Sequence, residues 1–261
     1  MPELPEAEMV RRYVEGRCLG RTITRVQVLD GSIIDGIPPD RFARSVHGKM
    51  LRRARRHGKQ LFIDLGDMFM AVHLGMTGDL LLLERGERLP PHARVIFSLD
   101  DKTRLVYDDP RKFGAVGVAS SIDEFVQEHR LGPDALKVPR KEFVERSQRS
   151  RRSIKAVLLD QHVVAGVGNL YADESLFQSK LHPLTPSAKL SEEELGRLWS
   201  EIRRVLRASI KSSTDFQKLP EDFLLRSRSA GSRCPRGNGM LEYIRVAGRT
   251  TIFCPVCQTH K

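Results

Sequence analysis

The chain has 261 residues, with 44 Lys and Arg against 33 Asp and Glu, a net charge of +11 and a pI near 9.8. This excess of positive charge favours a polyanionic partner, nucleic acid before an anionic membrane surface. No stretch of the sequence approaches the ~20 apolar residues of a membrane span, and the acidic N-terminus lacks an apolar signal region. We therefore expect no membrane partner and a cytoplasmic protein of bacterial type. Its four cysteines fit a metal site better than a disulfide framework.

The predicted elements change character near residue 131. Apolar residues at helical spacing predict a helix over residues 2–16. Segments of strand composition follow, at residues 22–30, 51–57, 60–66, 69–75, 79–84, 93–100 and 103–109. Helical segments come next, at 141–148, 153–162, 169–180 and 191–213, and a hairpin between cysteines ends the chain. The sequence predicts an α+β multidomain protein with an N-terminal helix and antiparallel β-sandwich (1–130), a helical domain (131–225) and a hairpin (226–261).

Two dense basic runs stand out, RRARRHGK (52–59) and RSQRSRRSIK (146–155). Each alone fits a solvated protein face. Together with the C-terminal cysteines, they favour nucleic-acid binding.

The N-terminal stretch MPELPEAE allows two interpretations. Proline suits the first turn of a helix, and acids suit a helix N-terminus. Alternatively, removal of Met1 makes Pro2 the N-terminus, and its amine performs chemistry. A second stretch, QHVVAGVGNLYADE (161–174), predicts a helix ending near Val164, a Gly-x-Gly turn and a helix from about Asn169. Such a turn lets backbone N–H groups approach an anion, although alone it fits an ordinary helix joint.

These stretches, with HGKQLFIDL, HLGMTG (73–78) and DPRKFG (109–114), resemble the formamidopyrimidine-DNA glycosylases and their endonuclease VIII relatives. The motifs occur in the family's order over nearly the whole chain, and Leu4 in MPELPE is similar to the formamidopyrimidine branch. The resemblance implies a β-sandwich domain, a helix–two-turn–helix domain and a zinc finger, with damaged double-stranded DNA as partner. It also implies a bifunctional DNA glycosylase and abasic-site lyase of base-excision repair.

The candidate catalytic residues are Pro2, Glu3, Glu6 and Lys59. By reference pKa values of ~8 for an α-amine and ~10.4 for lysine, an N-terminal amine is unprotonated up to a few hundred times more often. Attack by a secondary amine gives an iminium whose fixed charge is an electron sink for β,δ-elimination. The resemblance assigns Glu3 to protonating the sugar ring oxygen and Lys59 to contacting the lesion's phosphate. Glu6 lies one helical turn after Glu3 on the same face, so it can orient Pro2 or a water.

The resemblance also implies a set of DNA-contacting residues. Phosphate-binding positions are His73, Asn169 and Arg249, and Lys155 matches a position near the damaged base. Met76, Arg111 and Phe113 match residues that fill the gap left by the extruded base. Without the resemblance, Met76 and Phe113 would be assigned to the core and Lys155 to a solvated helix face. Lys112 stands where arginine is common in the family.

The expected zinc finger lacks one cysteine. Cys234, Cys254 and Cys257 match ligand positions, but Gly237 replaces the fourth. Structural zinc takes four ligands, so His260, a water or another side chain would complete the site, or the finger folds without metal. Chemistry is expected to need no cofactor.

Two rival functions remain from the sequence. One is a catalytically silent protein that binds abasic or bent DNA, and the other is an RNA-binding module with a zinc ribbon. The intact Pro2, Glu3 and Lys59 argue against the first, and the second leaves the N-terminal block unexplained. Compared with the pattern of family members that excise 8-oxoguanine well, the interval at 213–234 looks shorter and richer in arginine, which predicts a preference for other lesions. We expect a monomer.

Overall fold

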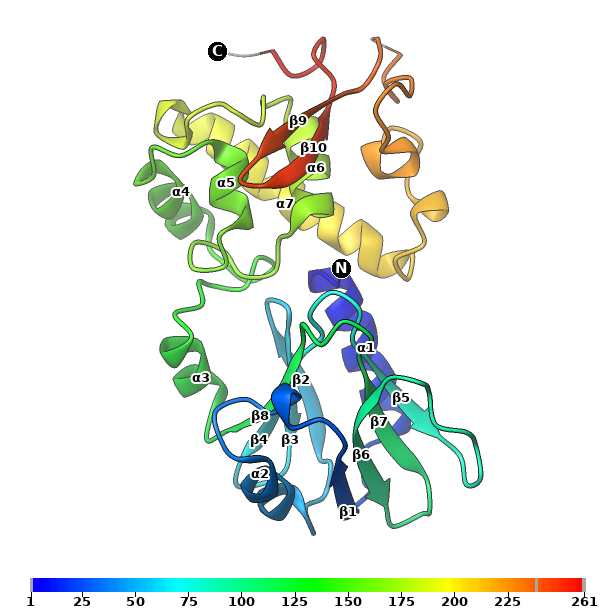
Figure 1. Cartoon of the computed structure of the whole chain (residues 1–261). Helices are drawn as coiled ribbons and strands as arrows, with labels where there is room; N and C mark the ends of the chain where they lie inside the picture. Colours follow the sequence, from blue (N-terminus) through cyan, green and yellow to red (C-terminus); the bar gives the residue numbers. More distant parts are fainter. Residues whose placement is uncertain (1, 238, 260–261) are drawn as a thin grey trace. The chain divides into compact units, whose positions relative to one another are not determined.

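The computed structural model describes residues 2–237 and 239–259, and the chain forms two compact units (Figure 1). The N-terminal unit contains Pro2 and residues 6–130, and the C-terminal unit contains residues 3–5 and the chain from Leu131 onward. Helix α1 (Leu4–Arg17) therefore begins in the C-terminal unit and continues in the N-terminal unit. A further domain boundary at residue 225 stays a prediction.

The N-terminal unit consists of two four-stranded antiparallel sheets and helix α1. One sheet has the order β1 (Ile23–Val28), β6 (Ala93–Leu99), β7 (Arg104–Asp108) and β5 (Asp79–Leu83). The other has the order β2 (Arg53–His57), β3 (Gln60–Asp64), β4 (Phe69–His73) and β8 (Ala115–Ala119). A shared core joins the sheets and α1, which confirms the predicted sandwich class; its members include Val14, Leu61, Ile63, Val95 and Phe97.

Strand β3 is buried on both faces, which explains its continuous apolar sequence. Leu61 and Ile63 face the core between the sheets. Phe62 packs instead on Phe125 of helix α3 (Ile122–Glu128), with ring centroids 5.1 Å apart. Such a strand lacks the polar alternation of a half-exposed one.

Three elements of this unit escape the sequence prediction: β8, α3 and helix α2 (Pro39–Val46). Strand β8 reads AVGVA, too small and too short to give a strong strand signal. Its glycine has a steric reason, because a Cβ on Gly117 would lie 3.1 Å from the carbonyl oxygen of Asp35.

The C-terminal unit is helical and carries a two-stranded hairpin. Its helices are α4 (Arg140–Gln148), α5 (Ile154–Leu159), α6 (Asn169–Gln178) and α7 (Glu192–Lys211). Short 3-10 turns cover Gly31–Ile33 in the first unit and Ser187–Lys189, Phe216–Lys218 and Leu224–Ser227 (η4) in this one. Strands β9 (Glu242–Val246) and β10 (Arg249–Phe253) form the hairpin.

Helix α6 is the centre of the C-terminal unit. Residues 171–179 are all buried, including two consecutive acids, Asp173 and Glu174. Helix α5 ends at Leu159, earlier than the sequence predicts, because the Asp160 side chain accepts a hydrogen bond from the N–H of His162 and starts the turn. No helix within the described residues is both long and apolar enough to cross a membrane.

Candidate active-site and nucleic-acid-binding residues

The carboxylate of Glu3 lies against the first turn of α6. Its Oε2 accepts hydrogen bonds from the N–H of Gly168 at 2.8 Å and of Tyr171 at 3.3 Å, and its Oε1 accepts one from Leu170 N–H at 2.8 Å. Glu3 is fully buried. These N–H groups belong to a helix start, where donors lack intrahelical partners and the dipole is positive. The anion held by the Gly-x-Gly turn is thus a carboxylate of the chain itself.

Glycines allow the N-terminal residues to approach this turn. A Cβ on Gly168 would lie 2.4 Å from the carboxyl carbon of Glu3, and one on Gly166 would lie 2.6 Å from Cδ1 of Leu4. Gly166 also has a φ of +115°, which disfavours any other residue. Gln161 fixes the turn, because its Oε1 accepts from Gly166 N–H at 2.9 Å while its Nε2 donates to a carbonyl of the same turn.

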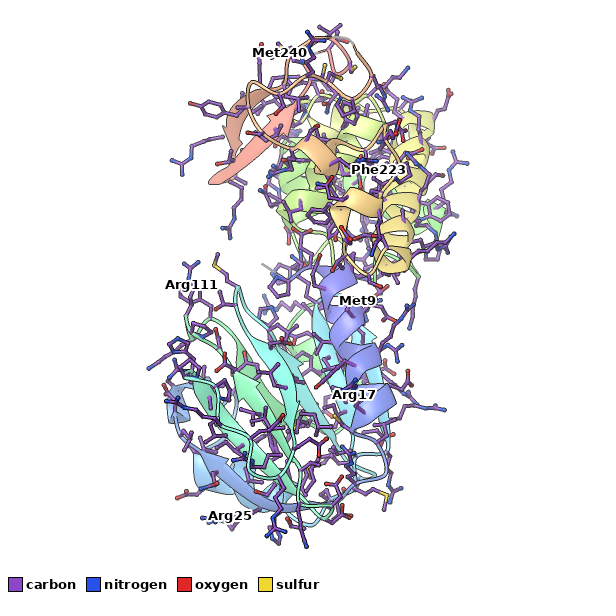
Figure 2. All side chains as sticks on the ribbon, turned by 90° about the vertical axis from the view of Figure 1, so that its right-hand side faces the viewer. Met9, Arg17, Arg25, Arg111, Phe223 and Met240 are labelled. Atoms are coloured by element: carbon purple, nitrogen blue, oxygen red, sulfur yellow. The ribbon has the colours of Figure 1, made fainter. Side chains whose placement is uncertain are left out.

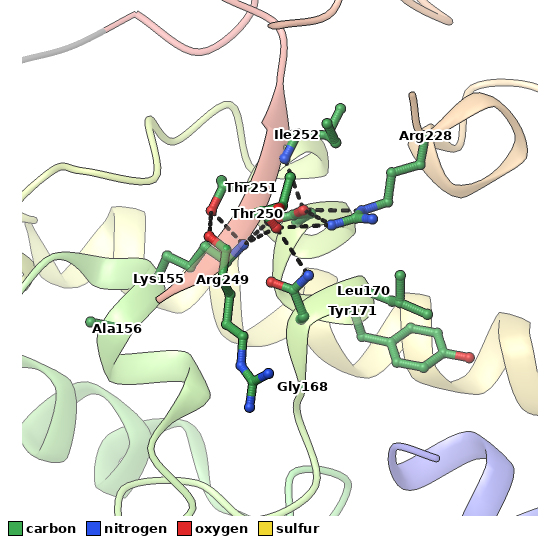
Figure 3. A network of polar contacts seen from close by, with 12 residues as sticks. Lys155, Ala156, Gly168, Leu170, Tyr171, Arg228, Arg249, Thr250, Thr251 and Ile252 are labelled. Carbon is green, nitrogen blue, oxygen red and sulfur yellow. Dashed lines mark hydrogen bonds and ion pairs between the residues drawn. The ribbon is translucent and has the colours of Figure 1, made fainter. Parts of the chain in front are cut away.

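Two predicted phosphate-binding residues, Asn169 and Arg249, lie where β10 meets the start of α6; Figure 3 labels Arg249. Asn169 donates through Nδ2 to the carbonyl oxygen of Thr250 at 3.0 Å. Its Oδ1 is buried and has no hydrogen-bond partner within the described residues. Arg249, the neighbour of Thr250, has an exposed side chain. A backbone contact therefore keeps the two residues together.

Lys155 is completely buried, unlike a solvated helix lysine. Its Nζ lies 2.6 Å from Oδ1 of Asp173 and 2.6 Å from Oγ1 of Thr251. Burial lowers the pKa of Lys155, and the negative charge of Asp173 opposes that change. Glu3 also acts electrostatically on Lys155. Its proximity to a damaged base stays a prediction, while its contacts in the DNA-free chain are with the protein.

Lys59 and Glu6 lie in the N-terminal unit. Lys59 follows Gly58 in the tight turn between β2 and β3, and Glu6 is half-buried in the first turn of α1. Arg56 donates to the carbonyl of Gly58 at 2.7 Å and to Glu8 of α1 at 3.3 Å. Through Arg56, Glu8 thus ties α1 to the turn that carries Lys59.

His73, at the end of β4, is held as a neutral hydrogen-bond donor. Gly75 N–H donates to its Nδ1 at 3.3 Å, so we assign the ring proton to Nε2. Burial lowers the pKa of His73, and the charge of Lys59 lowers it further. Nε2–H can therefore donate to a phosphate oxygen without the imidazole being charged.

The HLGMTG and DPRKFG loops touch backbone to backbone. A Cβ on Gly75 would lie 2.4 Å from the nitrogen of Gly114, and one on Gly114 would lie 1.8 Å from the hydroxyl oxygen of Tyr107. Only glycines permit this approach. The glycines therefore place the side chains of the two loops at one end of the unit.

Asp109 joins the same two loops and is a residue that sequence reasoning missed. Its carboxylate accepts from the Thr77 hydroxyl at 2.7 Å, from Gly114 N–H at 2.9 Å and from Arg111 N–H at 3.2 Å. Burial would raise the pKa of Asp109, but these hydrogen bonds outweigh burial and lower it. The Asp-Pro dipeptide in a turn was the available sequence signal.

The three candidate gap-filling side chains project from these loops. Phe113 is 55% exposed, Met76 is half-buried, and the Arg111 guanidinium lies 4.8 Å from the centre of the Phe113 ring. Figure 2 labels Arg111 at the end of the N-terminal unit where these two loops lie. A large apolar ring exposed beside a cation suits stacking on a base better than packing in a core.

Cys234, Cys254 and Cys257 form one cluster, with sulfur atoms within 4.8 Å of one another. Burial raises the pKa of Cys254 to about 11 in the metal-free chain. Gly237 is exposed, and its φ of +74° is a left-handed conformation. Three thiols in reach of one ion fit a soft metal such as zinc, but they supply three of its four ligands. His260 lies outside the described residues.

Comparisons with known proteins agree with this arrangement. The family model for the formamidopyrimidine-DNA glycosylase N-terminal domain matches residues 1–116, and that for its H2TH domain matches residues 131–218. The formamidopyrimidine-DNA glycosylase of Carboxydothermus hydrogenoformans is 39% identical, over 99% of this chain and 100% of that protein. The Chloroflexus aurantiacus enzyme is 37% identical, over 99% and 98%.

Solved structures give the same result. The Lactococcus lactis formamidopyrimidine-DNA glycosylase bound to DNA with an abasic site has a TM-score of 0.90 at 29% identity, covering 99% of this chain and 100% of that one. Its complex with DNA containing a formamidopyrimidine lesion also has a TM-score of 0.90, at 30% identity, covering 98% and 100%. Both matched domains, in this order, are those of a DNA glycosylase of DNA repair. Identity above 30% over almost the full length makes the assignment specific. The chain belongs to the formamidopyrimidine-DNA glycosylase family.

Proposed function

We propose that this glycosylase is bifunctional, removing oxidised or ring-opened bases and then cutting the strand by β,δ-elimination. The observation that carries the proposal is the Glu3 carboxylate, seated on three N–H groups of α6 directly after Pro2 in the chain. Glu3 is buried and fixed by these hydrogen bonds, and a reacting group must be held in a fixed position.

Pro2 supplies the nucleophile once Met1 is removed. Its nitrogen attacks C1′ of the deoxyribose, the C1′–base bond breaks, and the departing base takes up a proton. The ring oxygen then takes up a proton and the ring opens while the nitrogen releases its own proton, which leaves an iminium with no N–H to lose. The iminium withdraws electrons, so loss of a proton from C2′ expels the 3′-phosphate, and loss of a second proton, from C4′, then expels the 5′-phosphate.

Glu3 is proposed to protonate the ring oxygen of the sugar, and Glu6 to orient Pro2 or a water. Lys59 is proposed to contact the phosphate of the lesion. His73, Asn169 and Arg249 would bind neighbouring phosphates, which sets the register without reading sequence. Their hydrogen-bond donors support this role, including the Nε2–H of His73.

Met76, Arg111 and Phe113 are proposed to fill the space that the extruded base leaves. The exposed Phe113 ring and the rigid loop contact at Asp109 support this. A wedge must keep its position while a base pair opens.

Cys234, Cys254 and Cys257 would hold a structural zinc, which takes no part in the proposed chemistry. Damaged double-stranded DNA is the proposed partner, and the L. lactis complexes with lesion-containing DNA support it. We propose a monomer in a bacterial cytoplasm, because one site suffices for one lesion.

The resemblance in the interval at 213–234, which looks shorter than the pattern of relatives that excise 8-oxoguanine well, supports a preference among lesions. Each hydrogen bond missing from the base pocket lowers discrimination by about 1 kcal/mol, a several-fold effect. We propose efficient action on abasic sites and ring-opened bases, with slower excision of 8-oxoguanine. Single-turnover rates on duplexes that differ only in the lesion test this. Fastest excision of 8-oxoguanine opposite cytosine would contradict it.

Borohydride trapping on abasic DNA tests the central proposal. The wild-type protein should become covalently attached, its intact mass should lack one methionine, and Pro2→Gly should greatly reduce trapping. Glu3→Gln should bind DNA normally and lose base removal. A protein that binds abasic DNA tightly and never traps would instead be the silent binder, and normal trapping by a variant that retains Met1 would exclude Pro2.

A further inference from the structure

Asp173 on α6 is a shared partner for groups from three other segments; Figure 3 labels its partners Lys155, Arg228 and Ile252. Its Oδ1 binds Lys155 Nζ of α5 at 2.6 Å. Its Oδ2 binds Nε of Arg228 at 3.0 Å, with Nη2 also in contact, and the backbone N–H of Ile252 on β10 at 3.0 Å. One buried carboxylate therefore joins α5, β10 and the segment that follows η4.

Arg228 extends this network to the proposed phosphate-binding residues. Its Nη2 donates to the carbonyl of Thr250 at 3.2 Å, the oxygen that also accepts from Asn169 Nδ2 at 3.0 Å. That peptide directly follows Arg249. Movement of Arg228 would therefore shift the support of Asn169 and the strand that carries Arg249.

The guanidinium of Arg228 is largely committed to the protein. Its side chain is 15% exposed, and three of its hydrogen bonds go to Asp173 and Thr250. A guanidinium has five N–H donors in a fixed fork, so few remain for DNA. The geometry suits a group that aligns others.

The segment that carries Arg228 is fixed at a second point by the next residue of α6. Glu174 accepts the N–H of Leu225 at 2.8 Å, and Leu224 and Leu225 are buried. Arg226, in the same segment, donates to the carbonyl of Leu219 and takes no part in the network. Two consecutive acids of α6 thus hold the segment from Leu225 to Arg228.

We propose that Arg228 is a positioning residue: through Asp173 and the Thr250 carbonyl, it aligns Asn169 and Arg249 for binding the phosphates of lesion-containing DNA. The proposal rests on the proposed phosphate-binding role of Asn169 and Arg249. Asp173 retains Lys155 when Arg228 is replaced, so the buried carboxylate keeps a cationic partner and the fold should persist.

The test compares Arg228→Ala, Arg228→Gln and the control Arg226→Ala for binding to a duplex with a tetrahydrofuran abasic analogue, below the unfolding midpoint of every variant. Arg228→Ala should weaken binding about tenfold, a coupling of ordinary size for residues in one network. Arg228→Gln keeps N–H donors for Asp173 and Thr250 without the charge, so it should lose less affinity for the duplex than Arg228→Ala. Arg226→Ala should bind like the wild type. The salt dependence of Arg226→Ala should equal that of the wild type.

A double-mutant cycle with Asn169→Ala separates positioning from direct contact. If Arg228 acts through Asn169, the effect of Arg228→Ala should largely vanish in the Asn169→Ala background. The proposal is overturned if Arg228→Ala binds like the wild type. It is equally overturned if the effects of Arg228→Ala and Asn169→Ala add fully, because Arg228 would then not act through Asn169. Should Arg228→Ala fail to fold, the cycle is run with Arg228→Gln under the same criteria. A wild type that neither binds nor traps abasic DNA refutes the proposed function instead.

Discussion

Replacing Gly168 with alanine perturbs the hydrogen bonds that hold the Glu3 carboxylate at the start of α6, and little else. The backbone at Gly168 is extended, with φ −129° and ψ −159°, so a side chain adds no backbone strain. The three heavy atoms nearest to an added Cβ all belong to Glu3: the carboxyl carbon at 2.4 Å, and Cγ and Oε1 at 2.7 Å. The added methyl group therefore pushes directly on Glu3, the proposed acid.

The size of the effect follows from these distances. Ordinary contact begins near 3.4 Å, so the carboxylate must retreat by about 1 Å. Hydrogen bonds of 2.8 Å would then lengthen to about 3.8 Å, which is no longer a hydrogen bond. We expect about 2–4 kcal/mol less stability, because bonds to a charged group are lost. A displacement of this size should lower the rate of the chemical step about a hundredfold.

The assay is single-turnover base excision, with duplex affinity and thermal unfolding measured on the same protein. Gly168→Ala should resemble Glu3→Gln in excision rate while binding DNA within a few-fold of the wild type. Gly16→Ala is the matched control, because a Cβ there meets nothing within 4 Å and alanine favours a helix by up to ~1 kcal/mol. It should excise at the wild-type rate.

Wild-type excision by Gly168→Ala, together with reduced stability, would refute the reasoning. The carboxylate would then have moved without consequence, so its position on α6 could not be catalytic. A parallel loss of affinity and rate would point to a distorted α6 start, and the assignment to Glu3 alone would fail.

At the cysteine cluster, Gly237→Cys should lower the free energy of unfolding by about 1 kcal/mol in the absence of metal, because φ of residue 237 is +74°. The same variant should bind zinc more tightly. Chelator titration measures the zinc affinity and unfolding measures the stability, and His260→Ala tests whether His260 is the fourth ligand. Burial raises the pKa of Glu174 to about 7 from 4.5, so the folded state retains a proton that the unfolded state has lost. The associated stability is complete below pH ~4.5 and declines by about 3 kcal/mol as the pH rises through 7. Glu174→Gln should flatten that decline in urea titrations. Asp109→Ala should loosen both wedge loops, slowing excision of a paired lesion about tenfold while abasic trapping stays near the wild-type rate; equal slowing of both steps would contradict the wedge role.

The fold class could be predicted because most strands carry their own apolar signal. QLFID and ARVIFSL are buried over most of their length and read as strands in isolation. Strand β8, AVGVA, lacks that signal, since its small residues are set by close neighbours such as Asp35. The boundary of α5 was missed for a similar reason, because a side chain of the following turn decides it.

The site was predictable as a set of residues and not as a set of contacts. The Gly-x-Gly turn indicates an anion, but Glu3 lies 165 positions away, and proximity in the fold decides that its carboxylate is the anion. Lys155 reads as a surface lysine because its partners, Asp173 and Thr251, come from other elements. Arg228 carries no sequence signal beyond its charge.

The long separation in sequence between Glu3 and the start of α6, which binds its carboxylate, has a consequence for synthesis on the ribosome. The first residues to emerge reach their final place only after α6, 165 positions later, has left the exit tunnel. At about 5–20 residues per second, that delay is roughly 8 to 33 seconds. Throughout this interval the N-terminus is accessible to a methionine aminopeptidase. On the proposed mechanism, removal of Met1 therefore frees the amine of Pro2 before α6 is available to bind Glu3, the residue after Pro2.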